Sequence, residues 1–335
     1  MSEPTIHHLP EGAPRLDRFL AEAHPDIARS RWEAWIRSGQ VLVDGVAATK
    51  PGTRLRAGAQ VATTLPDPAP PAHFLEPEAF DLPTLFEDNR LWIVDKPAGL
   101  VVHPGPGHPS GTVLNALLGR LHAAPAPLAE GEDPAEEDEE ADAPRWPGLV
   151  HRLDRFTTGC LAMAKDQGAQ TALQAQFKAR SVDKRYLAIA RMSRRLPEAG
   201  SLLVDAPIGR QRSDRLKMAV VPQGRPSQTR VRVLGRAAGL ALVECELLTG
   251  RTHQIRVHLA HLGAPILGDP LYGGAGAWMD ADRRSHACPT PMLHAWRLAL
   301  DHPGDGRRLS CEAPLPEAFR EVLAGLGLAA PAPLS

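Results

Sequence analysis

The chain has 335 residues, of which 43% are hydrophobic and 23% are charged, and its formal net charge is −1. This length corresponds to about two domains of ~150 residues, and the composition excludes a collagen-like or wholly disordered chain. No apolar run approaches the ~18–20 residues that a membrane helix needs, and the first residues do not form a secretory signal, so we expect a cytoplasmic protein without a membrane segment.

The first predicted domain covers residues 14–64 and follows a flexible segment, residues 1–13. Apolar residues at helical spacing begin at Leu16, and a second helix precedes Gly39. Alternating valines followed by Asp44-Gly45 predict a short strand and a hairpin turn. This pattern resembles an S4-type RNA-binding domain. The resemblance implies that basic side chains of the second helix and of the following strands contact structured RNA, and the matching candidates are Arg29, Arg31, Arg37 and Lys50.

Residues 65–83 contain six prolines and predict an extended linker. The second predicted domain, residues 84–328, combines apolar strands with amphipathic helices, which indicates an α+β fold. We expect strands at 91–94, 100–103, 160–164, 184–190 and near 230–248, and helices near 111–121, 167–180 and 252–263. Residues 329–335 are expected to form a flexible tail.

An acidic segment interrupts this second domain. Residues 122–147 are rich in Pro, Ala and acid, and we interpret them as a disordered insertion. Residues 130–142 hold nine acidic residues, and the chain without them would carry a net charge of +8. Residues 151–258 hold 20 Lys and Arg against 8 Asp and Glu. A basic body fits a polyanionic partner, although solvated surface charge explains the numbers equally well.

The cysteines and histidines do not predict a metal site. The four cysteines stand at positions 160, 245, 288 and 311 and form no C-x-x-C pair. The histidines at 253, 258 and 261 lack the spacing and the glutamate of a metalloprotease helix, and no segment matches a phosphate-binding or dinucleotide fingerprint.

Three segments contain candidate catalytic residues. Asp154 lies between two apolar segments and is flanked by Arg152 and Arg155, which would keep its carboxylate ionised and able to act as a nucleophile or base. Arg251 lies just before the predicted helix that begins near residue 252. Tyr186 lies in a strand-like run directly after Lys184 and Arg185. Local sequence alone leaves a purely structural role open for two of these residues, a surface ion pair for Asp154 and a core position for Tyr186.

Four segments in this order, VDKPAGLVVHPG, HRLDRFTTG, KRYLAIA and GRTHQIRVHLAHLGAPILGDPLYG, are similar to the RluA-type pseudouridine synthases. HPGPGHPSGTVLNALL, TTG and DAPIGRQRSDRLKMAV point to the RluD-like branch. The resemblance implies that the chain is an isomerase with a mixed, mainly antiparallel sheet flanked by helices, which converts uridine to pseudouridine in RNA without metal or organic cofactor. The branch modifies the loop of helix 69 in large-subunit ribosomal RNA, at uridines 1911, 1915 and 1917. The segment HRLDRFTTG departs from the family in one respect, because Phe156 stands where the family more often has aspartate.

The resemblance also implies residue roles. Asp154 matches the essential aspartate, Arg251 its arginine partner, and Tyr186 the tyrosine that stacks on the target base. Arg152 matches an arginine that fills the gap left by the extruded nucleotide, and Arg155 is a further candidate for contact with RNA. We expect a monomer.

Three alternatives remain open at this stage. They are a non-catalytic RNA-binding relative, a glycosidase, and an RluC-like enzyme acting at other large-subunit sites. A glycosidase would normally need a second carboxylate beside Asp154, and the motif segments offer none.

Overall fold

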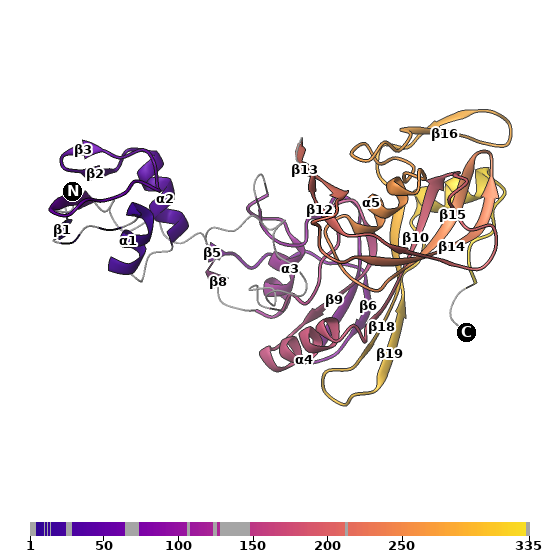
Figure 1. Ribbon diagram of the computed structural model, residues 1–335. Coiled ribbons are helices and arrows are strands. Elements are labelled where there is room, and N and C mark those ends of the chain that lie inside the picture. Colours follow the sequence, from indigo (N-terminus) through magenta and orange to yellow (C-terminus); the bar gives the residue numbers. More distant parts are fainter. Residues whose placement is uncertain are drawn as a thin grey trace. The chain divides into compact units, whose positions relative to one another are not determined.

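The computed structural model describes residues 5–9, 11, 13, 15–24, 29–63, 74–105, 108–122, 126–127, 148–211 and 214–332. These residues belong to two compact units, one within residues 1–74 and 127–133 and the other within residues 75–126 and 134–335 (Figure 1). The acidic segment 130–142 lies outside the described residues, so its predicted disorder remains a prediction. The predicted disordered insertion 122–147 is wrong at Ala126–Pro127, because these two residues form a short strand.

The N-terminal unit combines two helices with a four-stranded antiparallel sheet of order β1-β4-β2-β3. Its elements are β1 (Thr5–Leu9), α1 (Leu16–Ala23), α2 (Arg29–Arg37), β2 (Val41–Val43), β3 (Val46–Ala47) and β4 (Ala59–Thr63). The turn at Asp44-Gly45 is confirmed, since both residues have positive φ between β2 and β3. The expectation of a flexible segment 1–13 is wrong for β1, because β1 pairs with β4 along its whole length.

A buried carboxylate connects the two helices of this unit. Asp17 is fully buried in α1 and accepts hydrogen bonds from Arg15 at 2.9 Å and from Arg29 of α2 at 2.6 Å. The hydrogen bond from Arg15 is the main reason why the pKa of Asp17 falls to about 2, with Arg29 contributing and burial opposing the change. The charge on Asp17 therefore stabilises the packing of α1 against α2.

We expect Asp17→Asn to destabilise the N-terminal unit by about 2 kcal/mol, because the charge-assisted hydrogen bonds from two arginines, Arg15 and Arg29, are weakened. The folded-state pKa is lower than the unfolded one, so this stabilisation is complete above the ordinary carboxyl pKa and is lost as pH falls toward about 2. Hydrogen exchange of the α1 and α2 amides should become faster in Asp17→Asn and stay unchanged in the control Glu22→Gln, which removes an exposed pair with Arg18. Equal exchange in both variants would contradict this role.

The second unit is built on a mixed sheet. Its described elements are β5 (Phe74–Leu75), β6 (Thr84–Glu87), β7 (Leu91–Lys96), α3 (Val113–Arg120), β8 (Ala126–Pro127), β9 (Thr158–Ala164), α4 (Gln167–Lys178), β10 (Asp183–Arg191), β11 (Leu202–Asp205), β12 (Ile208–Gln211), β13 (Asp214–Val220), β14 (Gln228–Ala237), β15 (Leu240–Leu247), α5 (Gln254–His261), β16 (Ala277–Met279), β17 (Ser285–Ala287), β18 (Leu293–Asp301), β19 (Arg308–Glu312) and α6 (Glu317–Gly325).

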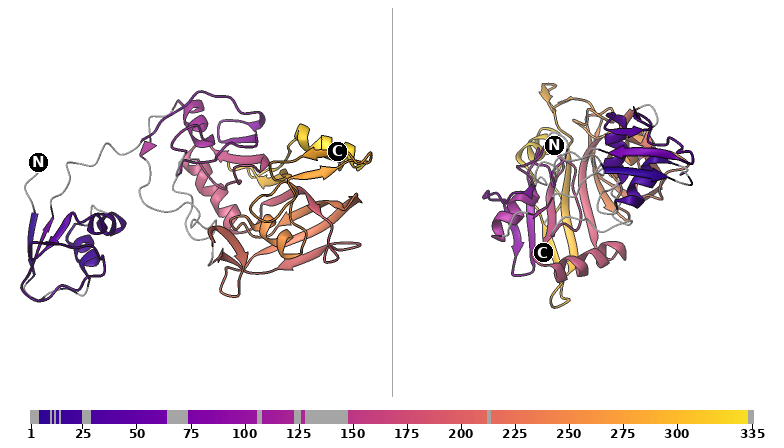
Figure 2. Two further views of the ribbon diagram at one scale, coloured as in Figure 1. Left: turned by 90° about the horizontal axis from the view of Figure 1, so that it is seen from above. Right: turned by 90° about the vertical axis from the view of Figure 1, so that its left-hand side faces the viewer.

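Nine strands of the described chain form the main sheet, in the order β11-β14-β15-β10-β18-β9-β7-β6, with β19 paired to β18. Figure 2 shows these strands side by side. The pairs are antiparallel except for β18 and β9, which run parallel and bring His294 opposite Thr158. The predicted α+β class with a mainly antiparallel sheet is confirmed. This parallel junction positions the loop that precedes β9.

One face of the sheet is covered by α4, which packs on β9 and β18. Leu173 and Phe177 of α4 meet the apolar side chains of Ile93, Ala162 and Leu298, all of them buried. The helix begins at the N-cap Asp166, whose side chain accepts a hydrogen bond from the Ala169 amide. This core provides a rigid support for the loop before β9.

Three expectations for this unit need correction. Residues 75–82 are not a linker, because Asn115 of α3 donates to the Glu76 carbonyl and accepts, through its own carbonyl, from the Glu78 amide. Residues 100–103 are not a strand, since the carbonyls of Val101 and Val102 accept hydrogen bonds from the first amides of α3 instead. The tail is held at least at Ala332, whose carbonyl accepts from Arg297 at 2.6 Å.

Candidate active site

Asp154 lies in the loop that leads into β9. The Thr157 amide donates to the Asp154 carbonyl at 3.0 Å and closes a tight turn. Gly159, the second residue of β9, has φ +107°, and an added Cβ would clash with the Ala295 carbonyl of β18. Only glycine allows the two parallel strands to approach this closely. The loop is therefore fixed where it joins the sheet.

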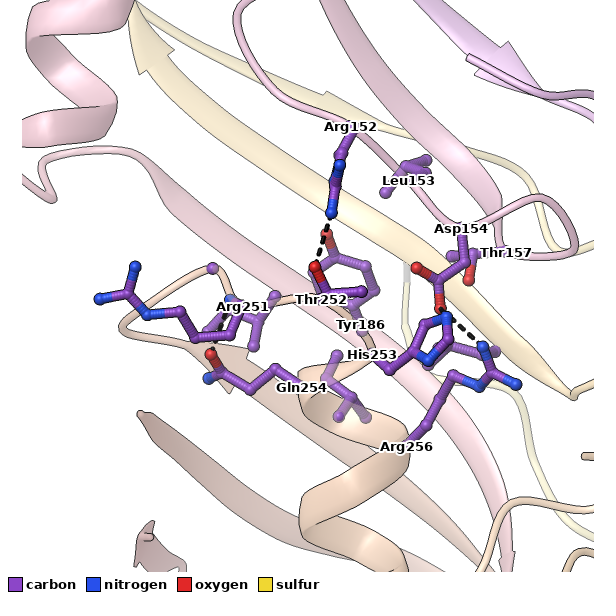
Figure 3. Close-up of a pocket in the computed structure, with 14 residues that line it drawn as sticks. Arg152, Leu153, Asp154, Thr157, Tyr186, Arg251, Thr252, His253, Gln254 and Arg256 are labelled. Carbon is purple, nitrogen blue, oxygen red and sulfur yellow. Dashed lines mark hydrogen bonds and ion pairs between the residues drawn. The ribbon is translucent and has the colours of Figure 1, made fainter. Parts of the chain in front are cut away.

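The Asp154 carboxylate is held by an arginine from α5. Arg256 donates from Nη1 to Asp154 Oδ2 at 3.1 Å. The same guanidinium binds Asp269, with Nε–Oδ2 at 2.7 Å and Nη2–Oδ1 at 2.9 Å. Asp269 is fully buried and also accepts from the Leu271 amide, so its position is well defined. The bidentate contact fixes the guanidinium plane and directs one N–H toward Asp154 (Figure 3).

The groups around Asp154 keep its carboxylate ionised. Burial opposes ionisation, but His253, Arg256 and Arg152 together outweigh it and lower the pKa of Asp154 below its ordinary value. Burial likewise opposes the charge on Arg256, whereas its hydrogen bonds to Asp269 and Asp154 raise the pKa of the guanidinium. At neutral pH the site therefore presents an oriented carboxylate beside a permanent cation.

His253 and Tyr272 form a hydrogen-bonded pair behind this carboxylate. His253 is the N-cap of α5 and has φ +58°, a conformation that costs a residue other than glycine some strain. Its Nδ1 lies 2.7 Å from the Tyr272 hydroxyl and its Nε2 lies 3.9 Å from Asp154 Oδ2. Burial raises the pKa of Tyr272 to about 12, so the phenol keeps its proton. When Tyr272 donates to Nδ1, the remaining N–H of His253 faces Asp154.

Tyr186 and Arg152 lie around the same pocket. Tyr186 comes from β10, is 7% exposed, and lines the pocket with Asp154, Leu247 and Ile255. Arg152 donates from Nη2 to the Thr252 hydroxyl at 2.6 Å, which joins the Asp154 loop to the start of α5. The structure therefore brings Asp154, Tyr186 and Arg152 together, as the sequence predicts, and leaves room beside an aromatic ring.

The predicted pairing of Arg251 with Asp154 is wrong in this structure. Arg251 lines the pocket, but its guanidinium points away from Asp154 (Figure 3), and its Nε lies 3.5 Å from the Pro226 carbonyl. Its amide is bound to the side chain of Gln254, the first residue of α5, so Arg251 precedes the helix and projects outward. The partner of Asp154 is Arg256, a buried residue of α5 five positions after Arg251, which sequence reasoning did not identify.

The remaining predicted RNA-binding residues lie elsewhere. Arg155 is exposed on the Asp154 loop, and its Nε donates to the Gly99 carbonyl at 3.1 Å. In the N-terminal unit Arg29 binds Asp17, Arg37 lies 3.2 Å from Glu33, and Lys50 is exposed. The side chain of Arg31 lies outside what the structure describes. Contact of these residues with RNA stays a prediction.

A buried lysine supports the Asp154 loop. Lys96 is fully buried at the end of β7, and its Nζ donates to the carbonyls of Pro97, Leu100 and Arg155 at 2.9, 2.9 and 3.0 Å. Burial lowers the pKa of Lys96 to about 7, although Asp154 and Asp95 oppose this change. The lysine therefore connects β7 to the residue that follows Asp154.

We expect Lys96→Met to abolish one component of the pH dependence of stability. The pKa of Lys96 is lower in the folded protein than in the unfolded chain. Between the two values the unfolded chain binds the proton and the folded protein does not, so the free energy of unfolding rises with pH. The wild-type melting temperature should therefore rise between pH 7 and 10 relative to that of Lys96→Met. A difference between the two melting curves that is constant with pH would contradict this assignment.

The structure shows no cluster of potential metal ligands among the residues that it describes. Within the same part of the chain, no helix is long and apolar enough to cross a membrane.

Comparison with known proteins identifies the class. Residues 90–261 match the RNA pseudouridylate synthase family, and residues 14–61 match the S4 domain. The chain therefore belongs to the RNA pseudouridylate synthases of the RluA type and carries an S4 domain in addition, so it is an isomerase that forms pseudouridine in RNA.

Individual relatives are similar over nearly the whole chain. The ribosomal large subunit pseudouridine synthase D of Xanthomonas campestris is 42% identical over 93% of this chain and 88% of its own. The protein of the same name from Escherichia coli is 40% identical over 92% of this chain and 89% of its own. The structure of human RNA pseudouridylate synthase domain containing 4 is 29% identical, with a TM-score of 0.52, and the match covers 75% of this chain and 95% of the human chain.

Proposed function

We propose that this enzyme acts on large-subunit ribosomal RNA, in the loop of helix 69, and that Asp154 is its catalytic carboxylate. The observation that carries the proposal is the ionised Asp154, held by Arg256 in a pocket with Tyr186. The choice of large-subunit ribosomal RNA is supported by the names of the relatives at about 40% identity, and the loop of helix 69 is proposed from the resemblance of the sequence motifs to the RluD-like branch.

The chemistry requires the target base to leave its stack. The N1–C1′ bond breaks, the base rotates, the C5–C1′ bond forms, and C5 loses the proton that N1 in effect regains. Extrusion from an RNA helix costs a few kcal/mol. The Tyr186 ring in the pocket wall offers the extruded uracil a stacking surface, and Arg152 at the pocket edge offers a cation that can occupy the vacated position.

Asp154 can serve either of two routes to this isomerisation. Its carboxylate can attack C1′ and form a covalent ester, or it can remove a proton from the ribose and form a glycal. Both routes need a carboxylate that stays ionised in a partly desolvated pocket, and the Arg256 guanidinium meets this need. The reaction is a net isomerisation, so it needs no oxidant or reductant. We also propose that it proceeds without metal or organic cofactor and that the enzyme is a cytoplasmic monomer.

The test uses purified enzyme and an unmodified transcript of large-subunit ribosomal RNA. Carbodiimide treatment followed by reverse transcription marks each pseudouridine as a stop. We expect stops at uridines 1911, 1915 and 1917. Stops only at other large-subunit positions would indicate an enzyme with RluC-like target sites. A transcript without stops would contradict the proposal.

A further inference from the structure

Phe156 presents an aromatic ring to solvent beside the active site. It is 38% exposed, which makes it the most exposed of the Phe, Tyr and Trp side chains that the structure describes. It lies between Asp154 and Thr157 in the turn, and both of these neighbours line the pocket. An exposed apolar side chain alone carries no meaning. This ring, however, belongs to the short loop in which Asp154 and Thr157 line the pocket, although Phe156 is not itself one of the lining residues.

The turn that carries this ring is rigid. The Arg155 carbonyl accepts hydrogen bonds from the Gly99 amide at 2.9 Å and from Lys96 Nζ at 3.0 Å. The Arg155 side chain returns a hydrogen bond to the Gly99 carbonyl, and its guanidinium carbon lies 5.1 Å from the centre of the Phe156 ring. A ring on a fixed turn loses little conformational entropy when a ligand covers it.

The surroundings of the ring favour a nucleic acid over a protein partner. The Arg155 guanidinium lies over the ring, so a ligand that covers Phe156 meets a cation there, while Arg152 of the same loop lines the neighbouring pocket. An RNA strand with one nucleotide extruded into the pocket also has a neighbouring base that has lost a stacking partner. Aromatic side chains replace such stacking for about 1–3 kcal/mol per base, without preference for sequence.

We propose that Phe156 is a stacking platform for the base next to the isomerised uridine. Arg155 orients the ring and contacts the adjoining phosphate. The proposal rests on the function proposed above, since it assumes an RNA strand that enters the pocket at Asp154. It adds a binding residue that acts on a neighbouring nucleotide and leaves the isomerised uridine untouched.

The experiment compares Phe156→Leu with Phe156→Tyr on an RNA that wild-type enzyme modifies, with release of tritium from 5-tritiated uridine as the assay. Leucine keeps an apolar side chain but removes the ring, so KM should rise about tenfold while kcat at saturation stays within twofold. Tyrosine should restore the low KM. Leu203→Ala, which changes an exposed side chain on β11, should leave KM unchanged.

A second readout follows the neighbouring base itself. The nucleotides on either side of the target uridine are replaced one at a time by 2-aminopurine, whose fluorescence falls when it stacks. Wild type and Phe156→Tyr should quench one of the two positions, and Phe156→Leu should not. Unchanged KM and quenching in Phe156→Leu, or equal losses in Phe156→Leu and Phe156→Tyr, would overturn the platform. A wild-type enzyme without turnover on ribosomal RNA would instead refute the proposed function.

Discussion

Asp154→Asn is expected to abolish pseudouridine formation, with a loss of at least about a thousandfold in turnover, because the amide is neither a nucleophile nor a base. RNA binding and thermal stability should stay close to wild type, since asparagine keeps the shape and can still accept a hydrogen bond from Arg256. Tritium release measures the turnover, and filter retention measures the binding.

Asp301→Asn is the matched control for this variant. Asp301 is a half-exposed aspartate at the end of β18 that pairs with Arg308 at 3.1 Å. Its loss should leave turnover within twofold. If Asp154→Asn released tritium at a rate near that of the control, Asp154 would not be the catalytic group.

Arg256→Met is expected to lower turnover by about a hundredfold or more, because Asp154 loses its hydrogen-bonded cation. The same change leaves the buried Asp269 unpaired, which destabilises a protein by about 3–5 kcal/mol. A lower melting temperature is therefore expected as well. Arg256→Lys separates the two effects, because it keeps the charge and loses the bidentate geometry.

The distinguishing measurement is the dependence of kcat on pH. Removal of a neighbouring cation raises the pKa of a carboxylate, so the acid limb of the profile should move to higher pH in Arg256→Met and less in Arg256→Lys. Arg251→Met should leave the acid limb in place, because its guanidinium points away from Asp154. A shift in Arg251→Met without one in Arg256→Met would restore the pairing predicted from sequence.

Local periodicity was sufficient for many elements of this fold. The apolar pattern predicts α3 and α4, and strands such as β10 follow from their β-branched and apolar runs. The position of β18 could not be predicted in this way. It lies between β10 and β9, two strands more than a hundred residues earlier in the chain, and only the sheet as a whole decides that order.

The site shows the same limit. Asp154, Tyr186 and Arg152 come together as expected, but sequence reasoning chose Arg251 over Arg256 within a single segment. Which of the two arginines pairs with Asp154 depends on burial. A buried arginine in α5 needs a carboxylate partner, and Asp269, thirteen residues after Arg256, provides one. An arginine among Ile255 and Val257 with an aspartate in the next turn is the signal that would have identified it.

The most direct test of the central claim is complementation of a strain that lacks this gene. Ribosomal RNA is isolated from cells that express wild type, Asp154→Asn or no enzyme, and pseudouridine in the large subunit is quantified by mass spectrometry after cyanoethylation. Wild type should restore pseudouridine to the loop of helix 69, and Asp154→Asn, expressed at the same level, should not. Restoration by Asp154→Asn, or no deficit in the strain without the gene, would contradict the claim.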